Sequence, residues 1–169
     1  MLDGTNYFWA LDSGNYMYKS SSGVKLQTGD TIYVKGPGLS RVYVTGDFVM
    51  SGDSSIIIAP NASLELYVAG SKTSISSVNN GGNCSTFSYY GLPSNTDLAF
   101  SGNNAFLGTI YAPSAMFTLG GGGNTFIDFQ GSCVVYRIRM NGHFKFHYDE
   151  NLRREGPIRG FQVSQWAEL

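Results

Sequence analysis

Apolar and polar residues alternate in several short runs along the first half of the chain. In residues 31–35 and 41–45, apolar residues occupy every second position and a tyrosine lies between them, and residues 64–68 repeat this arrangement. A period of two is typical of half-buried β-strands. Glycine follows two of these runs, at Gly46 and Gly70, where tight turns are expected. The pattern predicts an all-β protein built from short strands.

The same local pattern returns at a nearly constant distance along the chain. Residues 42–46 return as residues 66–70, which is an offset of 24. The segment that starts at Phe106 returns at Phe129, 23 residues later, and the segment at Phe117 returns after 21 residues. This period predicts a right-handed parallel β-helix with coils of about 21–24 residues and about three strands in each. A β-sandwich also uses seven or more alternating strands and is the alternative fold, but it requires no such period.

Stacked coils place equivalent residues above one another. Because neighbouring strands are about 4.8 Å apart, we expect Val42 to lie over Leu66 in the core, and Ile110 over Cys133. The prediction is a single domain over residues 1–169, whose coils occupy residues 31–148. Residues 1–30 form the expected N-terminal cap and residues 149–169 the expected C-terminal cap.

Caps are expected because the ends of a β-helix expose core side chains and unpaired strand edges. Aromatic residues between positions 7 and 11 are the predicted N-terminal cover. No run longer than ten residues has helical spacing, except for a short helix over residues 150–153 that Asp149 could N-cap. In the C-terminal cap, His147 or Asp149 is expected to form a structural hydrogen bond, and Trp166 to pack behind a last strand with Phe161 and Val163.

Composition narrows the range of partners. The 169 residues include 22 Gly, and 11 basic residues stand against 12 acidic ones, for a net charge of −1. A chain with this balance has no general attraction to nucleic acid or to anionic membranes. No uninterrupted run of 18 apolar residues is present, so no membrane span is expected. Of the two cysteines, Cys84 and Cys133, the latter lies in an apolar run, which favours a buried free thiol over a disulfide.

Sites for metals and cofactors are not expected. His143 and His147 lie on one alternating run, where residues four apart share a face but are about 13 Å apart. That separation is too large for a single zinc ion. The glycine run at residues 120–124 lacks the Lys-Ser/Thr that follows in a phosphate-binding loop, so it is interpreted as a corner of the β-helix.

Catalysis also has little support in the sequence. No Gly-x-Ser-x-Gly motif is present, and no histidine lies beside a distinctive Ser or Cys. Polysaccharide cleavage would need a pair of carboxylates. Asp47 and Asp53 are the early candidates for such a pair. Asp97 and Asp128 are the candidates in the middle of the chain. None of them recurs with the repeat, so the chain is not predicted to be an enzyme.

Tyrosines form the most distinctive predicted surface. Tyr43 and Tyr67 occupy equivalent positions of the repeat, so their rings are expected to stack on one outer face, and Tyr33 and Tyr111 are candidates to extend it. Such a ladder can simply shield the strand backbone. It can also be a binding surface, because aromatic residues contact both sugars and proteins. Both interpretations remain open at this point.

Several motifs, taken in order, resemble one known kind of domain. These are residues 108–113 (Gly-Thr-Ile-Tyr-Ala-Pro), 117–120, 129–131, 141–142 and 146–152 (Phe-His-Tyr-Asp-Glu-Asn-Leu). Over about residues 40–166, the chain resembles a C-terminal domain of bacterial envelope proteins related to type IV pilus assembly components of the minor-pilin kind. It departs from that pattern at residues 135–138, where the corner is one residue shorter.

The resemblance implies a β-helix-like domain outside the cytoplasmic membrane, behind an N-terminal membrane segment that is absent from this chain. It implies no reaction. Together with the residue patterns, it predicts a non-catalytic structural or adhesive domain of a bacterial cell-envelope or pilus-associated protein. The expected partners are envelope or pilus proteins, surface glycans, or a second copy of the chain against its flat sides. The alternative is a carbohydrate-binding or polysaccharide-cleaving module on the same scaffold.

Overall fold

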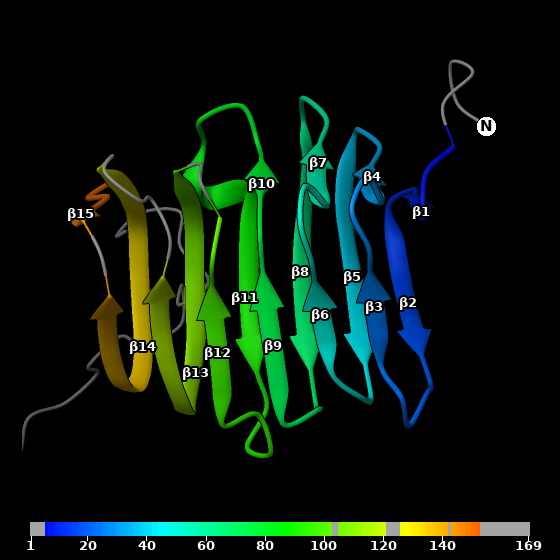
Figure 1. The fold of residues 1–169 in the computed structure, drawn as a ribbon. Coiled ribbons are helices and arrows are strands. Elements are labelled where there is room, and N and C mark those ends of the chain that lie inside the picture. The colour runs from blue at the N-terminus through cyan, green and yellow to red at the C-terminus, as the bar shows by residue number, and fades with distance from the viewer. Residues whose placement is uncertain (1–5, 103–104, 121–125, 142, 153–169) are drawn as a thin grey trace, which may run out of the picture.

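The computed structural model describes residues 6–102, 105–120, 126–141 and 143–152. This part of the chain contains fifteen β-strands, one short 3-10 turn at Cys84–Thr86, and almost no other helix. Every strand pairing in it is parallel. The coils stack side by side along one axis, from the blue N-terminal coil to the orange C-terminal strand (Figure 1). The chain is therefore a parallel β-helix, and the β-sandwich alternative is wrong.

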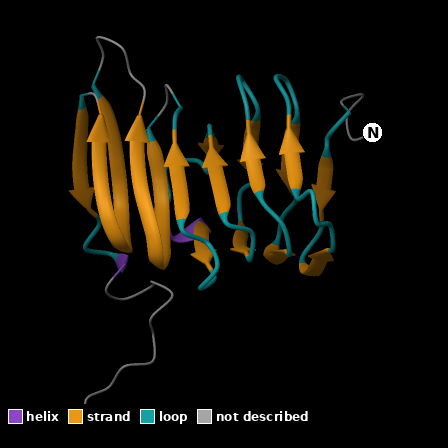
Figure 2. Ribbon diagram, turned by 60° about the horizontal axis from the view of Figure 1, so that its bottom comes forward, coloured by secondary structure: helices purple, strands orange, loops and turns teal. Residues whose placement is uncertain are grey.

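The strands line three faces of the β-helix, which we name faces A, B and C (Figure 2). Face A contains β2 (Gly14–Tyr18), β5 (Gly38–Val44), β8 (Ala62–Val68), β11 (Phe87–Gly91), the first halves of β13 (Phe106–Gly120) and β14 (Ile127–Asn141), and β15 (Phe144–Tyr148). Face B contains β3 (Val24–Leu26), β6 (Phe48–Met50), β9 (Lys72–Ile75), β12 (Asp97–Phe100) and the second halves of β13 and β14. Face C contains β1 (Trp9–Leu11), β4 (Thr31–Val34), β7 (Ser55–Ile58) and β10 (Val78–Asn79).

The register confirms the predicted period over the central coils. Paired residues are 24 positions apart between β5 and β8, 23 between β8 and β11, and 21 between β11 and β13. Towards the ends the spacing widens to 26 between β2 and β5 and falls to 17 between β14 and β15. The loops between strands absorb these differences, while the pairing within each face stays in register.

Inward side chains form continuous ladders in the core. The predicted pairs are both present: Val42 lies opposite Leu66, and Ile110 lies opposite Cys133. Towards the C-terminal end, Phe106, Phe129 and Phe146 form a ring stack, with centroids 4.8 and 4.4 Å apart. Phe106 and Phe129 are fully buried and contribute about 1.5–3 kcal/mol each to folding, whereas Phe146, the last ring of the stack, is 41% exposed. Because the coils stack, the buried side chains form one hydrophobic core that extends along the axis.

One corner is built from glycines at equivalent positions. Gly46 separates β5 from β6, and Gly70 separates β8 from β9. The amide of Gly70 donates a hydrogen bond to the carbonyl of Gly46 (3.1 Å), so the two backbones are in direct contact. A Cβ at Gly46 would overlap the carbonyl oxygen of Ser20, and one at Gly70 would overlap the amide of Asp47. The predicted turns at these glycines are confirmed.

The first coil begins earlier than predicted. Residues 9–26, placed in the N-terminal cap by the sequence, form β1, β2 and β3, and all three pair in register with the second coil. The reason is that two of these strands have only three residues, too few to display an alternating pattern. Trp9 does lie at this end, where its ring contacts Phe8 and Tyr18 at 5.5 Å and packs against the core.

At the C-terminal end, the first turn of the predicted helix is partly described. The carboxylate of Asp149 accepts a hydrogen bond from the amide of Asn151 (3.0 Å), as an N-cap does. His147 contacts the carboxylate of Asp128 at 3.3 Å. Each of these two residues, one of which was expected to form a structural hydrogen bond, thus has a side-chain partner. Trp166, Phe161 and Val163 lie outside the described residues, as does most of the predicted C-terminal cap.

Both cysteines are free. Cys84 is buried, and its thiol lies 3.3 Å from the carbonyl oxygen of Gln130. Burial, reinforced by the charge of Asp149, raises the pKa of the Cys84 thiol to about 11. Cys133 is only partly buried, and it packs against the core from its edge. Among the described residues, no helix has the length and hydrophobicity required to cross a membrane.

Candidate binding face

Four tyrosines lie side by side on the outer side of face A. Tyr43 pairs with Tyr67, Tyr67 with Tyr90, and Tyr90 with Tyr111, on four successive strands. Met17 occupies the same position before Tyr43. We call this row of four tyrosines the tyrosine face. It exists because strand alternation points every second residue outward and the coils keep these positions in register.

Two of the rings are locked together. Tyr67 and Tyr90 are stacked with centroids 4.5 Å apart and planes 8° from parallel. Burial raises the pKa of Tyr90, and it raises that of Tyr67 to about 12, where the hydrogen bond to Glu65 adds to the effect. Both phenols are therefore neutral at physiological pH. They offer a hydroxyl group and no charge.

A charged pair borders the tyrosine face. Arg41 and Glu65 are register partners on β5 and β8, and the Nε of Arg41 donates to Oε2 of Glu65 at 2.7 Å. The same carboxylate oxygen accepts the hydroxyl of Tyr67 at 3.0 Å. The hydrogen bond and the charge of Glu65 raise the pKa of Arg41 above its usual value. Arg41, Glu65 and Tyr67 thus form one connected unit across two coils.

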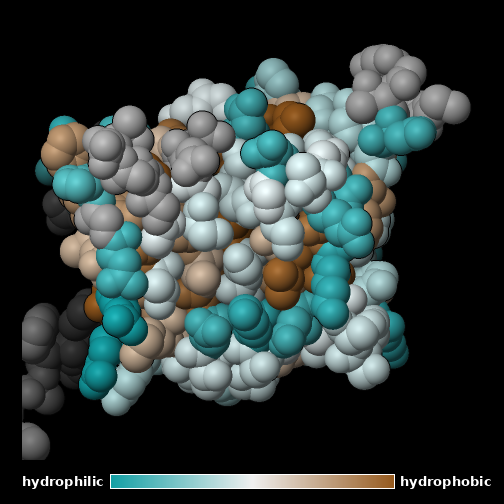
Figure 3. Space-filling view, in the orientation of Figure 1, coloured by the Kyte–Doolittle hydropathy of each residue, from teal (hydrophilic) through white to brown (hydrophobic). Residues whose placement is uncertain are grey.

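A shallow hollow of about 380 Å³ lies at the N-terminal end of this face. It is lined by Asn15, Tyr16, Met17, Arg41, Tyr43 and Tyr67. Its volume falls within the range of roughly 300–1,000 Å³ for small-molecule sites. Elsewhere on the molecule, the side shown in Figure 3 carries mostly hydrophilic and neutral residues, with small hydrophobic areas between them.

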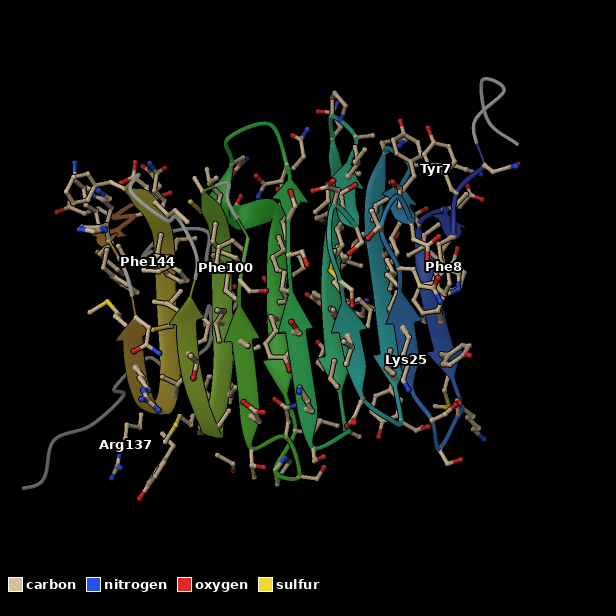
Figure 4. The ribbon with its side chains drawn as sticks, in the orientation of Figure 1. Tyr7, Phe8, Lys25, Phe100, Arg137 and Phe144 are labelled. Carbon is tan, nitrogen blue, oxygen red and sulfur yellow. The ribbon has the colours of Figure 1, made fainter. Side chains whose placement is uncertain are left out.

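The structure brings together three of the four predicted tyrosines. Tyr43, Tyr67 and Tyr111 belong to one row, but Tyr33 does not. Tyr33 lies in β4 on face C, where its register partners are Ala10 and Ile57 and its ring stacks on Tyr7 at 5.0 Å. Tyr7 and Phe8 lie at the N-terminal end of the molecule (Figure 4). The prediction that Tyr33 extends the same face is wrong. Tyr33 and Tyr43 belong to the same coil, and each coil places only one strand on each face.

Sequence reasoning missed Tyr90 and the Arg41–Glu65 pair. Tyr90 follows the inward-facing Tyr89, so the double tyrosine hides the alternation. The signal was nevertheless available, since Tyr90 lies 23 residues after Tyr67, one coil further on. Arg41 and Glu65, which have opposite charges, are likewise one coil apart.

Two of the four carboxylates considered for catalysis, Asp47 and Asp128, have partners of their own. Asp47 accepts hydrogen bonds at a corner from the amide of Lys72 (3.0 Å) and from the hydroxyl of Ser71 (3.4 Å). Asp128 contacts His147, as described above. Within the described ranges, no group of three or more His, Cys, Asp or Glu side chains could hold a metal ion.

Comparison with known proteins gives one match. Searches of curated proteins and of solved structures find nothing similar to this chain. Residues 10–155 match the model of a family described as a domain of unknown function, DUF7305. This match covers nearly all of the β-helix, including every strand of the tyrosine face. The chain therefore belongs to the DUF7305 family.

Proposed function

We propose that this domain is a non-catalytic structural and adhesive module of a bacterial cell-envelope or pilus-associated protein, located outside the cytoplasm. In this role it contacts its partners, which are envelope proteins or surface glycans, through the tyrosine face. The single observation that supports the role most directly is the row formed by Tyr43, Tyr67, Tyr90 and Tyr111 on adjacent strands. The bacterial envelope setting rests on the sequence resemblance described above.

The tyrosine face has the physical properties of a contact surface. Tyrosine offers a large rigid area and a hydroxyl group, and it loses little conformational freedom on binding. Ring stacking between Tyr67 and Tyr90 holds two of the four side chains in place before any partner arrives. Tyr111 is 43% exposed, so part of its ring is open to a partner. A preorganised aromatic row of this kind favours adhesion over a purely protective role.

Removal of two tyrosines of the row should reduce adhesion without unfolding the domain. In the double variant Tyr43→Ser/Tyr111→Ser, retention of the fluorescently labelled domain on intact bacterial cells should fall about tenfold. The matched control is Tyr136→Ser, because Tyr136 is 69% exposed and lies outside the row. Circular dichroism of all three proteins should be the same. Equal retention of the double variant and the control would contradict the proposal.

A second candidate function is favoured by the hollow beside Arg41. A carbohydrate-binding or polysaccharide-cleaving module would use such a recess to hold a sugar chain. The two activities can be separated by incubating the domain with acidic and neutral polysaccharides and measuring released reducing ends. Released product would overturn the non-catalytic role, whereas binding without release would be consistent with it.

A further inference from the structure

We propose that the hollow at the N-terminal end of the tyrosine face binds a neutral saccharide. This inference rests on the adhesive role proposed above and names the class of ligand. Three features support it: the apolar lining of the hollow, the polar groups at its border, and its charge balance.

The lining is unusually apolar for an exposed surface. Met17 is 61% exposed and Tyr16 is 36% exposed, and both line the hollow beside Tyr43 and Tyr67. One face of the Tyr67 ring is covered by Tyr90. Tyr43, the register partner of Tyr67 on the other side, has no such stacking partner among the described residues. These side chains offer apolar area to the C–H side of a sugar ring.

The border of the hollow offers both donors and acceptors. The hydrogen bonds recorded for this group use Nε of Arg41 and Oε2 of Glu65. Within the described part of the chain, the terminal nitrogens of Arg41, Oε1 of Glu65 and the side-chain amide of Asn15 have no hydrogen-bond partner and can serve a ligand. A sugar hydroxyl both donates and accepts, so it can bond to a guanidinium and to a carboxylate at once. Because Glu65 and Tyr67 already hold each other at 3.0 Å, little ordering is needed when a ligand binds.

The charge balance selects for a neutral ligand. Among the described residues that line the hollow, Arg41 is the single one with a charged side chain, and Glu65 forms an ion pair with it at 2.7 Å. The other lining residues, Asn15, Tyr16, Met17, Tyr43 and Tyr67, have no formally charged group. An acidic sugar would gain attraction from Arg41 but would meet repulsion of similar size from Glu65. A neutral sugar meets no such conflict.

The test uses the whole chain and defined probes. Neutral hexasaccharides of glucose, mannose and N-acetylglucosamine, and an oligogalacturonate of similar length, are titrated into the protein by isothermal calorimetry. At least one neutral probe should bind more tightly than the oligogalacturonate. Tyr43→Ala and Arg41→Gln should each weaken that binding about tenfold, whereas Tyr136→Ala should leave it unchanged.

A charge variant provides a sharper check. Glu65→Gln keeps an oxygen that can accept from Tyr67 but removes the negative charge, which leaves Arg41 unbalanced. This variant should gain affinity for the oligogalacturonate and should keep its melting temperature within a few degrees of the wild type. No gain in a folded Glu65→Gln protein would overturn the charge argument.

The remaining outcomes separate the ligand from the role. If no neutral probe binds while the tyrosine double variant still loses adhesion to cells, the ligand class is wrong and the adhesive role stands. If the domain binds envelope proteins but no saccharide, and this binding depends on the tyrosines, the partner is a protein and the saccharide proposal is wrong. If neither adhesion nor saccharide binding responds to the tyrosines, both proposals fail.

Discussion

At the scale of single residues, one polar network inside the core is fully satisfied. Tyr89 is fully buried, and its hydroxyl lies 2.7 Å from Oγ1 of Thr73 and 2.9 Å from Oδ1 of Asn95. Asn95 in turn donates to the carbonyl of Gly70 (2.8 Å) and to Thr73 (3.0 Å). Burial raises the pKa of Tyr89 well above its usual value. The network anchors the loop before β12 to the preceding coil, through Gly70 and Thr73.

Loss of the Tyr89 hydroxyl should destabilise the domain. Tyr89→Phe keeps the ring but removes a hydrogen-bond partner from two buried side chains, which should cost about 1–3 kcal/mol of unfolding free energy. Urea denaturation measures this cost. Tyr136→Phe, at an exposed position, should change the stability by less than about 0.5 kcal/mol. If the two variants have the same free energy of unfolding, the network does not contribute to the stability of the domain.

At the scale of elements, the corners determine how closely successive coils approach. At the corner between faces A and B, Gly46 and Gly70 let two turns pack backbone to backbone. In a later coil the chain turns this corner without a glycine turn. There β13 continues from face A to face B, with a register shift between Ala112 and Met116. The β-helix thus uses glycine corners in its first coils and bent strands in its last ones.

Gly46→Ala should therefore be costly although it adds only a methyl group. The new Cβ would meet rigid backbone of the preceding coil, and overpacking of this kind costs about 1–3 kcal/mol or more. Gly120→Ala is the matched control, because a Cβ there meets no atom of the described residues within 4 Å. Thermal unfolding of both variants compares them directly. A melting temperature for Gly46→Ala equal to that of Gly120→Ala would show that the corner relaxes freely.

At the scale of the whole molecule, the last coil is less well covered than the central coils. Phe117 and Leu119 in β13 are fully buried, yet their register partners in β14, Ile138 and Met140, are 41% and 55% exposed. Among the described residues, the strand that follows β14, β15, pairs only with residues 127–131 of it, so no described strand lies over Ile138 and Met140. Arg137 projects outward at this end of the molecule (Figure 4). Equivalent inward side chains in adjacent coils therefore contribute differently to the free energy of unfolding.

This gradient can be measured along one ladder. Phe117→Ala should cost about 3–5 kcal/mol, because Phe117 is fully buried and its loss leaves a cavity in the core. Ile138→Ala, one coil further on, should cost less than half as much, because its side chain is already partly in water. Urea denaturation of the two variants provides the comparison. Equal losses would mean that the C-terminal coil is as well covered as the central ones.

The sequence predicted the fold better than the site, for a physical reason. Alternation shows whether a residue points inward or outward, and the period shows which residues stack, as for Val42 and Leu66. Neither pattern assigns a strand to one of the three faces. For this reason Tyr33 was grouped with Tyr43, although the two belong to the same coil. Tyr90 was missed because Tyr89 beside it obscures the alternation, and the three-residue strands of the first coil were too short to recognise.

The hydrogen bonds between coils all run along the axis of the β-helix, since every pairing between strands is parallel and links one coil to the next. A force applied along the axis of the β-helix therefore acts on every interface between coils, and the hydrogen bonds of the weakest interface break first. A pull along the strands instead shears many bonds at once. A domain attached so that tension follows its strands would withstand flow much better than one pulled end to end, where it would peel open one winding at a time.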